Sequence, residues 1–374
     1  MFEIFKTFLM LGCVSFGGPA AHIGYFRRAF VQQRGWLSDE EFARLIALTQ
    51  FLPGPGSSQL GFALGHKRAG LGGAIAAFLG FTLPSVVLMI LLASVSLSYL
   101  HQGWAQGIIH GLKLLAMVVV ADAVLGMFTS FCKAALHRWI CIISASVLLL
   151  YPSLLTQVGV LLAAALLGRL VTPDSGLRSG SITVQWLPLG LFALLWLLPM
   201  LLSLPLFSPF YQAGSLVFGG GHVVLPLLQS LVGGQMDSDT FLTGYAAAQA
   251  VPGPMFTLAS FLGYHLGGEA PILGALIATL AIFLPGFLLL LGLLKGWEGM
   301  AQMPGFAGAT AAINAAVTGI LLAALYQPVF SSSVSGAGDM ALVLVGFALL
   351  RLARLPVVVL VAGFALVGLA GGVL

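Results

Sequence analysis

The sequence predicts an all-α polytopic membrane protein built from two repeats in inverted orientation. Of its 374 residues, 59% are hydrophobic and only 7% are charged, which leaves too little polar surface to cover a soluble globule. A pattern of helix-breaking residues also occurs twice, as FGGP at 16–19 with QFLPGPG at 50–56, and as FGGG at 218–221 with QAVPGPM at 249–255. Broken backbone in a bilayer is tolerated only where it is buried in protein or lines a watery cavity, so the duplicated break predicts a duplicated solute site.

Apolar stretches long enough for helices run through the whole chain. In order, they lie near residues 4–30, 40–65, 70–98, 105–130, 138–152, 154–170, 186–204, 208–232, 239–265, 271–294, 304–328, 339–352 and 355–373. The one clearly polar connection, 172–185, is typical of a linker. We therefore expect a first repeat at 1–171, a linker with an unpaired transmembrane helix at 172–205, and a second repeat at 206–374.

The two halves align with few gaps, which indicates an internal duplication. Corresponding pairs are Gly12 and Gly214, Gln50 and Gln249, Pro53 and Pro252, Gly54 and Gly253, Pro55 and Pro254, His66 and His265, and Pro84 and Pro285. Because the helix at 186–204 has no counterpart, it adds one crossing and inverts every later segment. The first segment has its own counterpart at 210–221, so we expect residue 1 to belong to the fold rather than to a cleaved leader.

The breaks split the first two segments of each repeat into pieces that span about half of a 30 Å hydrocarbon core. The split segments either cross as discontinuous helices or turn back as re-entrant hairpins. If they cross, ten Lys and Arg lie on one side and four on the other, whereas re-entry places all fourteen on one side, with Lys113 inside a helix. The positive-inside rule favours re-entry, with the N-terminus in the cytoplasm and the C-terminus outside. It also explains the net charge of +4 without a nucleic-acid partner.

The first break is expected to end one helix and begin another. A capping box at 38–41 predicts a helix that runs from there to the Pro-Gly-Pro at 53–55. A short helix from about Gly56 follows, with serine hydroxyls in its first turn. Its unpaired N–H groups and the positive end of its dipole would bind an anion without a basic side chain. The second repeat has Met255 and Phe256 at this place.

The glycine-rich breaks allow close backbone approach. Pro19 fits the first position of another half-helix, and the glycines at 219–221 permit similar proximity. Four helix starts would then converge near a pseudo-twofold axis, a geometry that suits a compact oxyanion. For a single Gly-Gly or Pro-Gly pair, packing and kinking is the better explanation. Packing alone does not require Q-x-x-P-G-P twice, so the duplication favours a site.

Ionisable residues inside apolar segments are functional candidates because charge is costly in lipid. Lys113 and Asp122 lie nine residues apart and point in different directions, too far for a direct pair. Lys113 either attracts an anion or snorkels from a helix end, and Asp122 either carries a coupling proton or is simply hydrogen-bonded. His22 and His222 follow the two glycine breaks, and for them a titratable role and a packing role are equally supported.

The sequence gives little support to the hypothesis of an enzyme or of a metal site. Three cysteines form no pattern with histidine or with one another, so neither a disulfide framework nor a zinc site is indicated. No HExxH, GxGxxG after a strand or P-loop is present, nor an acidic pair of the kind that holds metal for diphosphate chemistry, and the serines after Gly56 lack evident His and Asp partners. We expect no enzymatic activity, no cofactor and no metal. Inverted repeats with broken helices serve both carriers and channels.

Several motifs of this sequence together resemble those of a known family. SFGGP at 15–19, RGWLSDEEF at 34–42, LPGP at 52–55, FGGGH at 218–222 and VPGP at 251–254 are together similar to the chromate ion transporter family, in its long two-domain bacterial form. The resemblance covers essentially the whole chain. It implies an inner-membrane protein that exports chromate by the proton motive force and so confers chromate resistance, with sulfate as a close analogue.

These observations predict a secondary transporter for an oxyanion, with a transporter of sulfate or another small anion as the alternative and an anion channel as a weaker one. The expected partners are chromate, sulfate as an analogue, and the lipid bilayer, and a homodimer is left open. The candidate site residues are Ser15, Gly17, Gly18, His22, Gln50, Pro53, Gly54, Pro55, Gly56, Ser57, Ser58 and Lys113 in the first repeat, and Gly219, Gly220, Gly221, His222, Gln249, Pro252, Gly253, Pro254 and Thr257 in the second. Asp122, His22 and His222 are the candidates for proton coupling.

Overall fold

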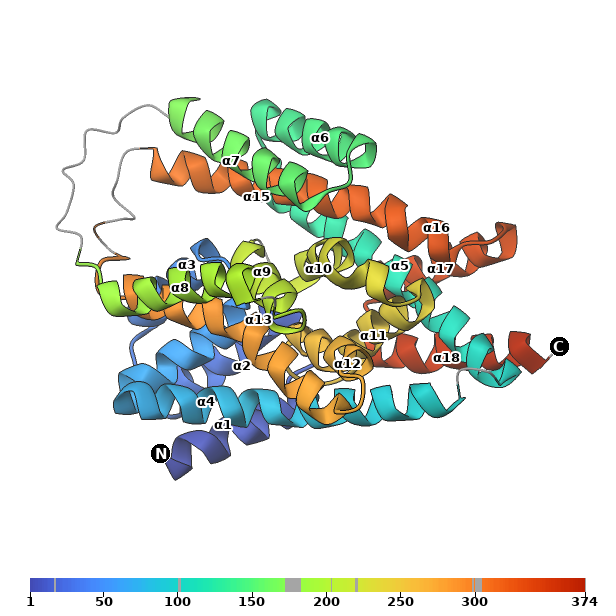
Figure 1. Ribbon diagram of the computed structural model, residues 1–374, viewed down its shortest axis with the longest axis horizontal. Helices are drawn as coiled ribbons and strands as arrows, with labels where there is room; N and C mark the ends of the chain where they lie inside the picture. Colours follow the sequence, from blue (N-terminus) through green and yellow to red (C-terminus); the bar gives the residue numbers. More distant parts are fainter. Residues whose placement is uncertain are drawn as a thin grey trace.

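The computed structural model is helical throughout the part of the chain that it describes, residues 1–16, 18–99, 102–171, 183–202, 204–218, 221–297, 299 and 305–373. The first repeat and the helix after it contain α1 (Phe2–Val14), α2 (Gly18–Phe26), η1 (Arg27–Gln33), α3 (Asp39–Phe51), α4 (Gly56–Tyr99), α5 (Gly103–Phe131), α6 (Ala135–Leu150), α7 (Leu154–Val171) and α8 (Trp186–Leu202). The second repeat contains α9 (Phe207–Leu216), η2 (Gly221–Val223), α10 (Val224–Val232), η3 (Gly233–Gln235), α11 (Ser238–Ala250), η4 (Met255–Thr257), α12 (Leu258–Leu266), α13 (Pro271–Leu293), α15 (Phe306–Ala324), η5 (Leu325–Phe330), α16 (Ser331–Ser333), α17 (Ala337–Arg351) and α18 (Val357–Val373) (Figure 1).

The predicted all-α polytopic membrane fold is confirmed. Among the described residues, five helical stretches are long and apolar enough to cross a membrane, at Gly56–Ser96, Gly103–Phe131, Leu154–Val171, Pro271–Leu293 and Phe306–Ser333. Shorter apolar helices at Ala135–Leu150, Trp186–Leu197 and Val357–Gly371 accompany them. Many large apolar side chains on these helices are exposed, which is expected of surfaces that face lipid.

The helix boundaries near the breaks largely follow the sequence. The capping box prediction is confirmed, because the Ser38 hydroxyl accepts from the Glu41 N–H at 3.2 Å and the Glu41 carboxylate accepts from the Ser38 N–H at 3.0 Å. The short helix begins at Gly56 as predicted. The helix after the first glycine break begins at Gly18, one residue before the predicted start at Pro19. Most of the expected linker, residues 172–182, lies outside the described residues.

The chain turns back on itself at the first break. The Phe8 ring of α1 lies 5.5 Å from the Phe26 ring of α2 and 4.8 Å from the Phe30 ring of η1, measured between centroids. The Arg34 guanidinium, just beyond η1, donates to the Thr7 hydroxyl at 3.2 Å. The segment after the break therefore runs back beside α1 as an antiparallel hairpin.

The second break of this repeat makes another hairpin. Glu41, near the start of α3, forms an ion pair with Lys67, near the end of the half-helix that begins at Gly56. The Arg68 guanidinium also lies over the ring of Trp36, which precedes α3, at 5.3 Å from its centroid. The beginning of the incoming helix and the end of the outgoing half-helix are thus neighbours, which a straight crossing would not allow.

The label α4 covers two helices joined at a sharp turn. Ala69 and Gly70 have non-helical backbone angles, with φ of +60° at Gly70. A Cβ on Gly65 would overlap the Gly73 carbonyl, although eight residues would separate the two by about 12 Å in a straight helix. The half-helix at 56–68 is therefore followed by a long helix that folds back along it.

The second repeat has the same hairpins. Helices α9 and α10 are in contact, as are α11 and α12, and α12 packs along α13. At the middle of the α11–α12 hairpin, Gly244 leaves room for the Phe261 ring, which a Cβ would meet at 2.5 Å.

The repeats exchange their last two helices. Helices α6 and α7 of the first repeat pack on α15 of the second, and α17 and α18 of the second pack on α5 of the first (Figure 1). Small residues allow both contacts, since a Cβ on Gly168 would overlap the Gly308 carbonyl and one on Gly368 would overlap the Gly107 carbonyl. Each half thus depends on the other for its packing.

The long helices of the two halves run antiparallel where they meet. The Ser96 hydroxyl near the end of α4 lies 3.2 Å from His265 Nε2, next to the start of α13. Farther along, the rings of Phe78 and Phe283 lie 5.2 Å apart between centroids. This contact pattern is the one that two oppositely oriented copies would produce, while inversion across a membrane stays a prediction.

Candidate functional site

The tips of the hairpins from both repeats meet, and two equivalent backbone hydrogen bonds join them. Gly54 N–H donates to the Val217 carbonyl at 2.7 Å, and Gly253 N–H donates to the Ser15 carbonyl at 2.9 Å. Each bond connects the Pro-Gly-Pro break of one repeat with the glycine break of the other. The duplicated motifs therefore come together at one place between the repeats.

Glycine is required at the centre of both Pro-Gly-Pro breaks. Gly54 and Gly253 have φ of +118° and +99°, values that residues with a side chain rarely adopt. A Cβ on Gly253 would also overlap the Ser85 hydroxyl, and one on Gly54 would meet the Gly286 Cα at 3.0 Å. The prolines on either side restrict the backbone further, so the chain reverses here with little conformational freedom.

Two side-chain bonds hold the carbonyls of these breaks. The Gln59 amide donates to the Pro53 carbonyl at 3.0 Å and to the Gly286 carbonyl of α13 at 2.9 Å. The Ser85 hydroxyl of α4 donates to the Pro252 carbonyl at 2.8 Å. Both side chains give broken backbone a partner, which a membrane interior requires, and each makes one bond that links the repeats, from Gln59 to Gly286 and from Ser85 to Pro252.

His22 joins the two hairpins of the first repeat. It is fully buried, its Nδ1 lies 3.1 Å from the Ser57 hydroxyl, and its Nε2 lies 3.1 Å from the Ser15 carbonyl. Both ring nitrogens therefore have partners. Of the two roles that the sequence leaves open for His22, this geometry favours packing and positioning.

The first break also contains polar side-chain atoms without a partner. The hydroxyls of Ser15, Ser58 and Thr82 and the Gln59 Oε1 atom are buried and accept or donate no hydrogen bond, and these four residues are 0 to 3% exposed. Such atoms are rare in proteins and call for an explanation. Ser58 and Gln59 lie in the first turn of the half-helix at Gly56, whose first N–H groups have no acceptor within the helix, and Ser15 is linked to the same turn through His22.

The second break is packed with apolar side chains instead. Met255 fills the space against Gly221, where a Cβ would meet its sulfur at 3.2 Å. The Thr257 hydroxyl and N–H both bond to the Pro254 carbonyl, at 2.8 and 3.0 Å. Phe256 is buried beside them. The helix start of this copy is thus closed by its own residues.

The second glycine break carries a small polar cluster of its own. His222 Nδ1 lies 3.0 Å from the Tyr245 hydroxyl and 3.3 Å from the Gln249 amide. Gln249, one of the candidate site residues, is therefore engaged with protein. Gly17, Gly219 and Gly220 lie outside the described residues.

The ionisable residues inside helices have partners that sequence reasoning missed. The Lys113 ammonium donates to the Asp239 carboxylate at 2.7 Å, which joins α5 to the start of α11. Asp122 accepts from Arg351 of α17 at 3.0 Å. Lys113 and Asp122 are indeed not paired with each other. No local signal in the sequence could have found these partners, because they come from the other repeat.

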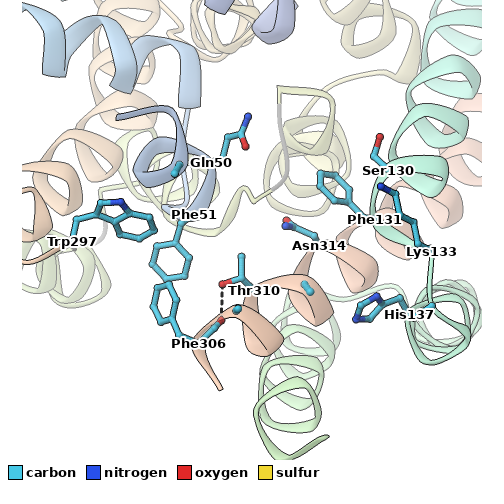
Figure 2. Close-up of a pocket in the computed structure, with 14 residues that line it drawn as sticks. Gln50, Phe51, Ser130, Phe131, Lys133, His137, Trp297, Phe306, Thr310 and Asn314 are labelled. Atoms are coloured by element: carbon cyan, nitrogen blue, oxygen red, sulfur yellow. Dashed lines mark hydrogen bonds between the residues drawn. The ribbon is translucent and has the colours of Figure 1, made fainter. Parts of the chain in front are cut away.

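Gln50, unlike Gln249, faces a cavity of about 580 Å³, here called the Gln50 cavity. It is lined by residues of α3, of the α5–α6 turn and of α15, among them Gln50, Phe51, Lys133, His137, Phe306 and Asn314. Figure 2 shows Gln50 across the cavity from Lys133 and His137, with Asn314 between them. The rings of Phe51 and Phe306, 4.1 Å apart between centroids, form an apolar wall. Within the described residues, no group of three His, Cys, Asp or Glu could hold a metal ion.

Comparison with known proteins identifies the family. The model of the chromate transporter family matches residues 2–169 and 204–369. The chain belongs to the chromate transporter family. It is 30% identical to a probable chromate transport protein of Synechococcus elongatus over 77% of this chain and 74% of the relative. It is 29% identical to a chromate transport protein of Cupriavidus metallidurans over 98% of this chain and 92% of the relative, and 30% identical to one of Pseudomonas aeruginosa over 76% and 70%.

The suspected resemblance to chromate ion transporters is thereby confirmed, and no solved structure matches the chain. Both matched regions of this chromate transporter family member include a glycine break and a Pro-Gly-Pro break. The two kinds of break described above are therefore part of the segment that the family model matches once in each half of the chain.

Proposed function

We propose that this protein is a secondary transporter of chromate, and that the anion binds at the first break. The observation that carries the proposal is the set of buried, unpartnered hydroxyls of Ser15, Ser58 and Thr82 near the start of the half-helix at Gly56. Relatives named chromate transport proteins support the choice of substrate.

A tetrahedral oxyanion suits this arrangement. Free N–H groups and the positive end of a helix dipole favour a negative charge, and hydroxyls can replace the water molecules that the ion leaves behind. In the described part of the chain, no Lys or Arg is hydrogen-bonded to the hydroxyls of Ser15, Ser58 and Thr82. Such a site replaces the hydration shell of a dianion without holding the ion in a strong ion pair, so the ion can also leave, as transport requires. Sulfate has the same shape and charge and is the second candidate substrate.

Export follows from the membrane potential. With the cell interior negative, moving a dianion outward gains about 4.6 kcal/mol per 100 mV, at about 2.3 kcal/mol per charge. Proton exchange would add to this, and Asp122, His22 and His222 stay the candidates for it. Chromate efflux that is unchanged when the pH gradient is collapsed and the voltage is kept would contradict proton coupling. Efflux of this kind would confer chromate resistance.

The proposed topology places the hairpins in the inner membrane as re-entrant segments, with the N-terminus in the cytoplasm and the C-terminus outside. The ion pair of Glu41 with Lys67 and the stacking of Arg68 on Trp36 support it, because they gather the open end of one hairpin on one side. The inverted orientation of the repeats belongs to the same proposal. A homodimer stays a prediction.

Uptake of chromate and of sulfate into everted membrane vesicles tests the function. Wild-type vesicles should accumulate chromate, and Pro53→Ala should reduce uptake strongly because it loosens the break that positions Gly56. Pro252→Ala is the matched change in the second repeat and should have the smaller effect. If neither substitution alters uptake at equal protein level, the site proposed at the breaks is wrong. Discrete single-channel currents would instead favour an anion channel.

A further inference from the structure

The Gln50 cavity has the size and lining of a site where an anion first meets the protein. A water molecule takes up about 30 Å³ in the liquid, so a cavity of about 580 Å³ has room for a partly hydrated oxyanion. Its residues come from both repeats, as those of the breaks do. It reaches the first break itself, because Gln50 lies three residues before Pro53.

The charge of the cavity is positive. Lys133 is exposed and His137 is half-buried, and neither side chain has a hydrogen-bond or ion-pair partner in the described part of the chain. Arg138 holds the turn that presents them, since its guanidinium donates to the carbonyls of Cys132 and Lys133 at 3.1 and 2.9 Å. None of the described lining residues is acidic.

Neutral donors continue from this positive turn toward the break. The side-chain amides of Gln50 and Asn314 line the cavity, and neither has a hydrogen-bond partner among the described residues, whereas the Thr310 hydroxyl is already bonded to the Phe306 carbonyl at 2.9 Å (Figure 2). Neutral amide N–H groups bind an oxyanion more weakly than positively charged side chains bind it. Binding would therefore weaken along the cavity, as onward movement requires.

The contrast with the other large cavity supports this assignment. A cavity of about 460 Å³ lies between the two repeats elsewhere and is lined by Gln157, Gln229, Ser230, Ser331 and Ser332 among others. Its described lining combines these polar side chains with apolar ones and includes no Lys, Arg or His. Positive charge is thus a property of the Gln50 cavity rather than of every polar hollow in the protein.

We infer that the Gln50 cavity is a capture site for a tetrahedral dianion, in which Lys133 and His137 bind the ion first and the amides of Gln50 and Asn314 pass it to the first break. The inference rests on the proposed function and adds the place where the substrate enters. Lys133 acts on capture, so its loss should raise KM and leave the maximal rate unchanged.

Chromate transport by the purified full-length protein in proteoliposomes tests this inference. Lys133→Gln should raise KM about tenfold at low ionic strength and leave Vmax unchanged, because a hydrogen bond to a charged group is lost. Lys133→Arg should keep KM within about twofold of wild type. Lys295→Gln is the matched control, since this exposed lysine does not line the cavity, and its KM should also stay within about twofold.

An unchanged KM in Lys133→Gln, or an equal rise in Lys295→Gln, overturns the capture site while leaving chromate transport intact. Binding of radiolabelled sulfate to the same purified proteins separates the two proposals. Wild-type protein that transports nothing but binds sulfate in a Lys133-dependent way would overturn the proposed function and support the cavity. Wild-type protein that neither transports nor binds would overturn both.

Discussion

The two breaks of this protein share a backbone and differ in what fills it. Each has a glycine with positive φ between two prolines, and each donates one backbone hydrogen bond to the opposite repeat. In the first, the hydroxyl of Ser58 in the first turn and that of Ser15 at the glycine break are buried without partners. In the second, Met255 and Phe256 are buried at the equivalent place. The scaffold is thus duplicated, whereas the chemistry is present in one copy.

This difference suggests a division of labour between the repeats. Buried polar atoms without partners cost free energy, of the order of 1–3 kcal/mol each, so the first break is less stable than it would be with apolar residues. The second break avoids that cost and holds the first through the bond from Gly253 to the Ser15 carbonyl. One repeat would then bind the ion while the other supports it.

The sharpest way to break the comparison is to remove hydroxyls from each copy. Replacing Ser58, whose hydroxyl has no partner in the described structure, by alanine should raise the KM for chromate by about ten- to a hundredfold, because a hydrogen bond to an anion is worth about 1.5–3 kcal/mol. Thr257→Ala should change KM by less than about twofold, since the Thr257 hydroxyl is already bonded to the Pro254 carbonyl. Transport kinetics in proteoliposomes would measure both. Equal effects would show that the two breaks bind alike.

Where a polar group of the first break is bonded, replacing it by its apolar counterpart from the second break should lower stability. Gln59 corresponds to Leu258, and its amide bonds to the Pro53 and Gly286 carbonyls. Gln59→Leu leaves both carbonyls without this donor and should reduce the free energy of unfolding by about 1–3 kcal/mol. Thermal unfolding in detergent measures the loss. The control is Leu258→Met, a volume-conserving change that should cost less than about 1.5 kcal/mol.

The sequence predicts local features of this site well and long-range pairs poorly. The capping box at Ser38 and the helix start at Gly56 follow from neighbouring residues, because the physical causes act within one turn. The equivalence of Gly54 and Gly253 follows from the repeat itself. These parts of the fold could be read without a structure, and so could the all-α membrane class.

The partners of Lys113 and His22 could not be predicted. Lys113 meets Asp239 because α5 packs on elements of the second repeat, and the sequence contains no signal for that exchange of helices. His22 meets Ser57 because two hairpins lie side by side, which depends on where each turns back. The Gln50 cavity was missed for the same reason, since Lys133 and Asn314 are brought together by packing between repeats.

The histidines after the two glycine breaks give a finer comparison. His22→Phe keeps a ring against Phe81, at 5.1 Å between centroids in the wild type, but loses the bonds to Ser57 and to the Ser15 carbonyl. We expect it to lower the free energy of unfolding by about 1–3 kcal/mol. His222→Phe should cost about 1 kcal/mol, because His222 is only partly buried and its partner Tyr245 keeps the Gln249 amide nearby. Chemical unfolding of both variants compares the losses.

The smallest effect concerns the caps at the open ends of the hairpins. Ser38 caps α3 with a neutral hydroxyl, whereas Asp237 caps α11 with a carboxylate that accepts from the Thr240 N–H at 2.7 Å. Burial pushes the pKa of Asp237 up, but the hydrogen bonds from Thr240 outweigh it and hold the pKa below its ordinary value. The lowered pKa of Asp237 stabilises the fold at pH values above the ordinary pKa of about 4, and this contribution is lost as the pH falls through the pKa of the folded state.

Ser38→Ala and Asp237→Ala should each lower the free energy of unfolding by about 1 kcal/mol at pH 7. The loss in Asp237→Ala should shrink near pH 3, whereas that in Ser38→Ala should not. Asp237→Asn keeps the cap without the charge. Thermal unfolding measured against pH should show that this variant has near wild-type stability at pH 7 and a weaker loss of stability in acid. If the variant loses as much stability in acid as the wild type, other carboxylates cause the acid dependence.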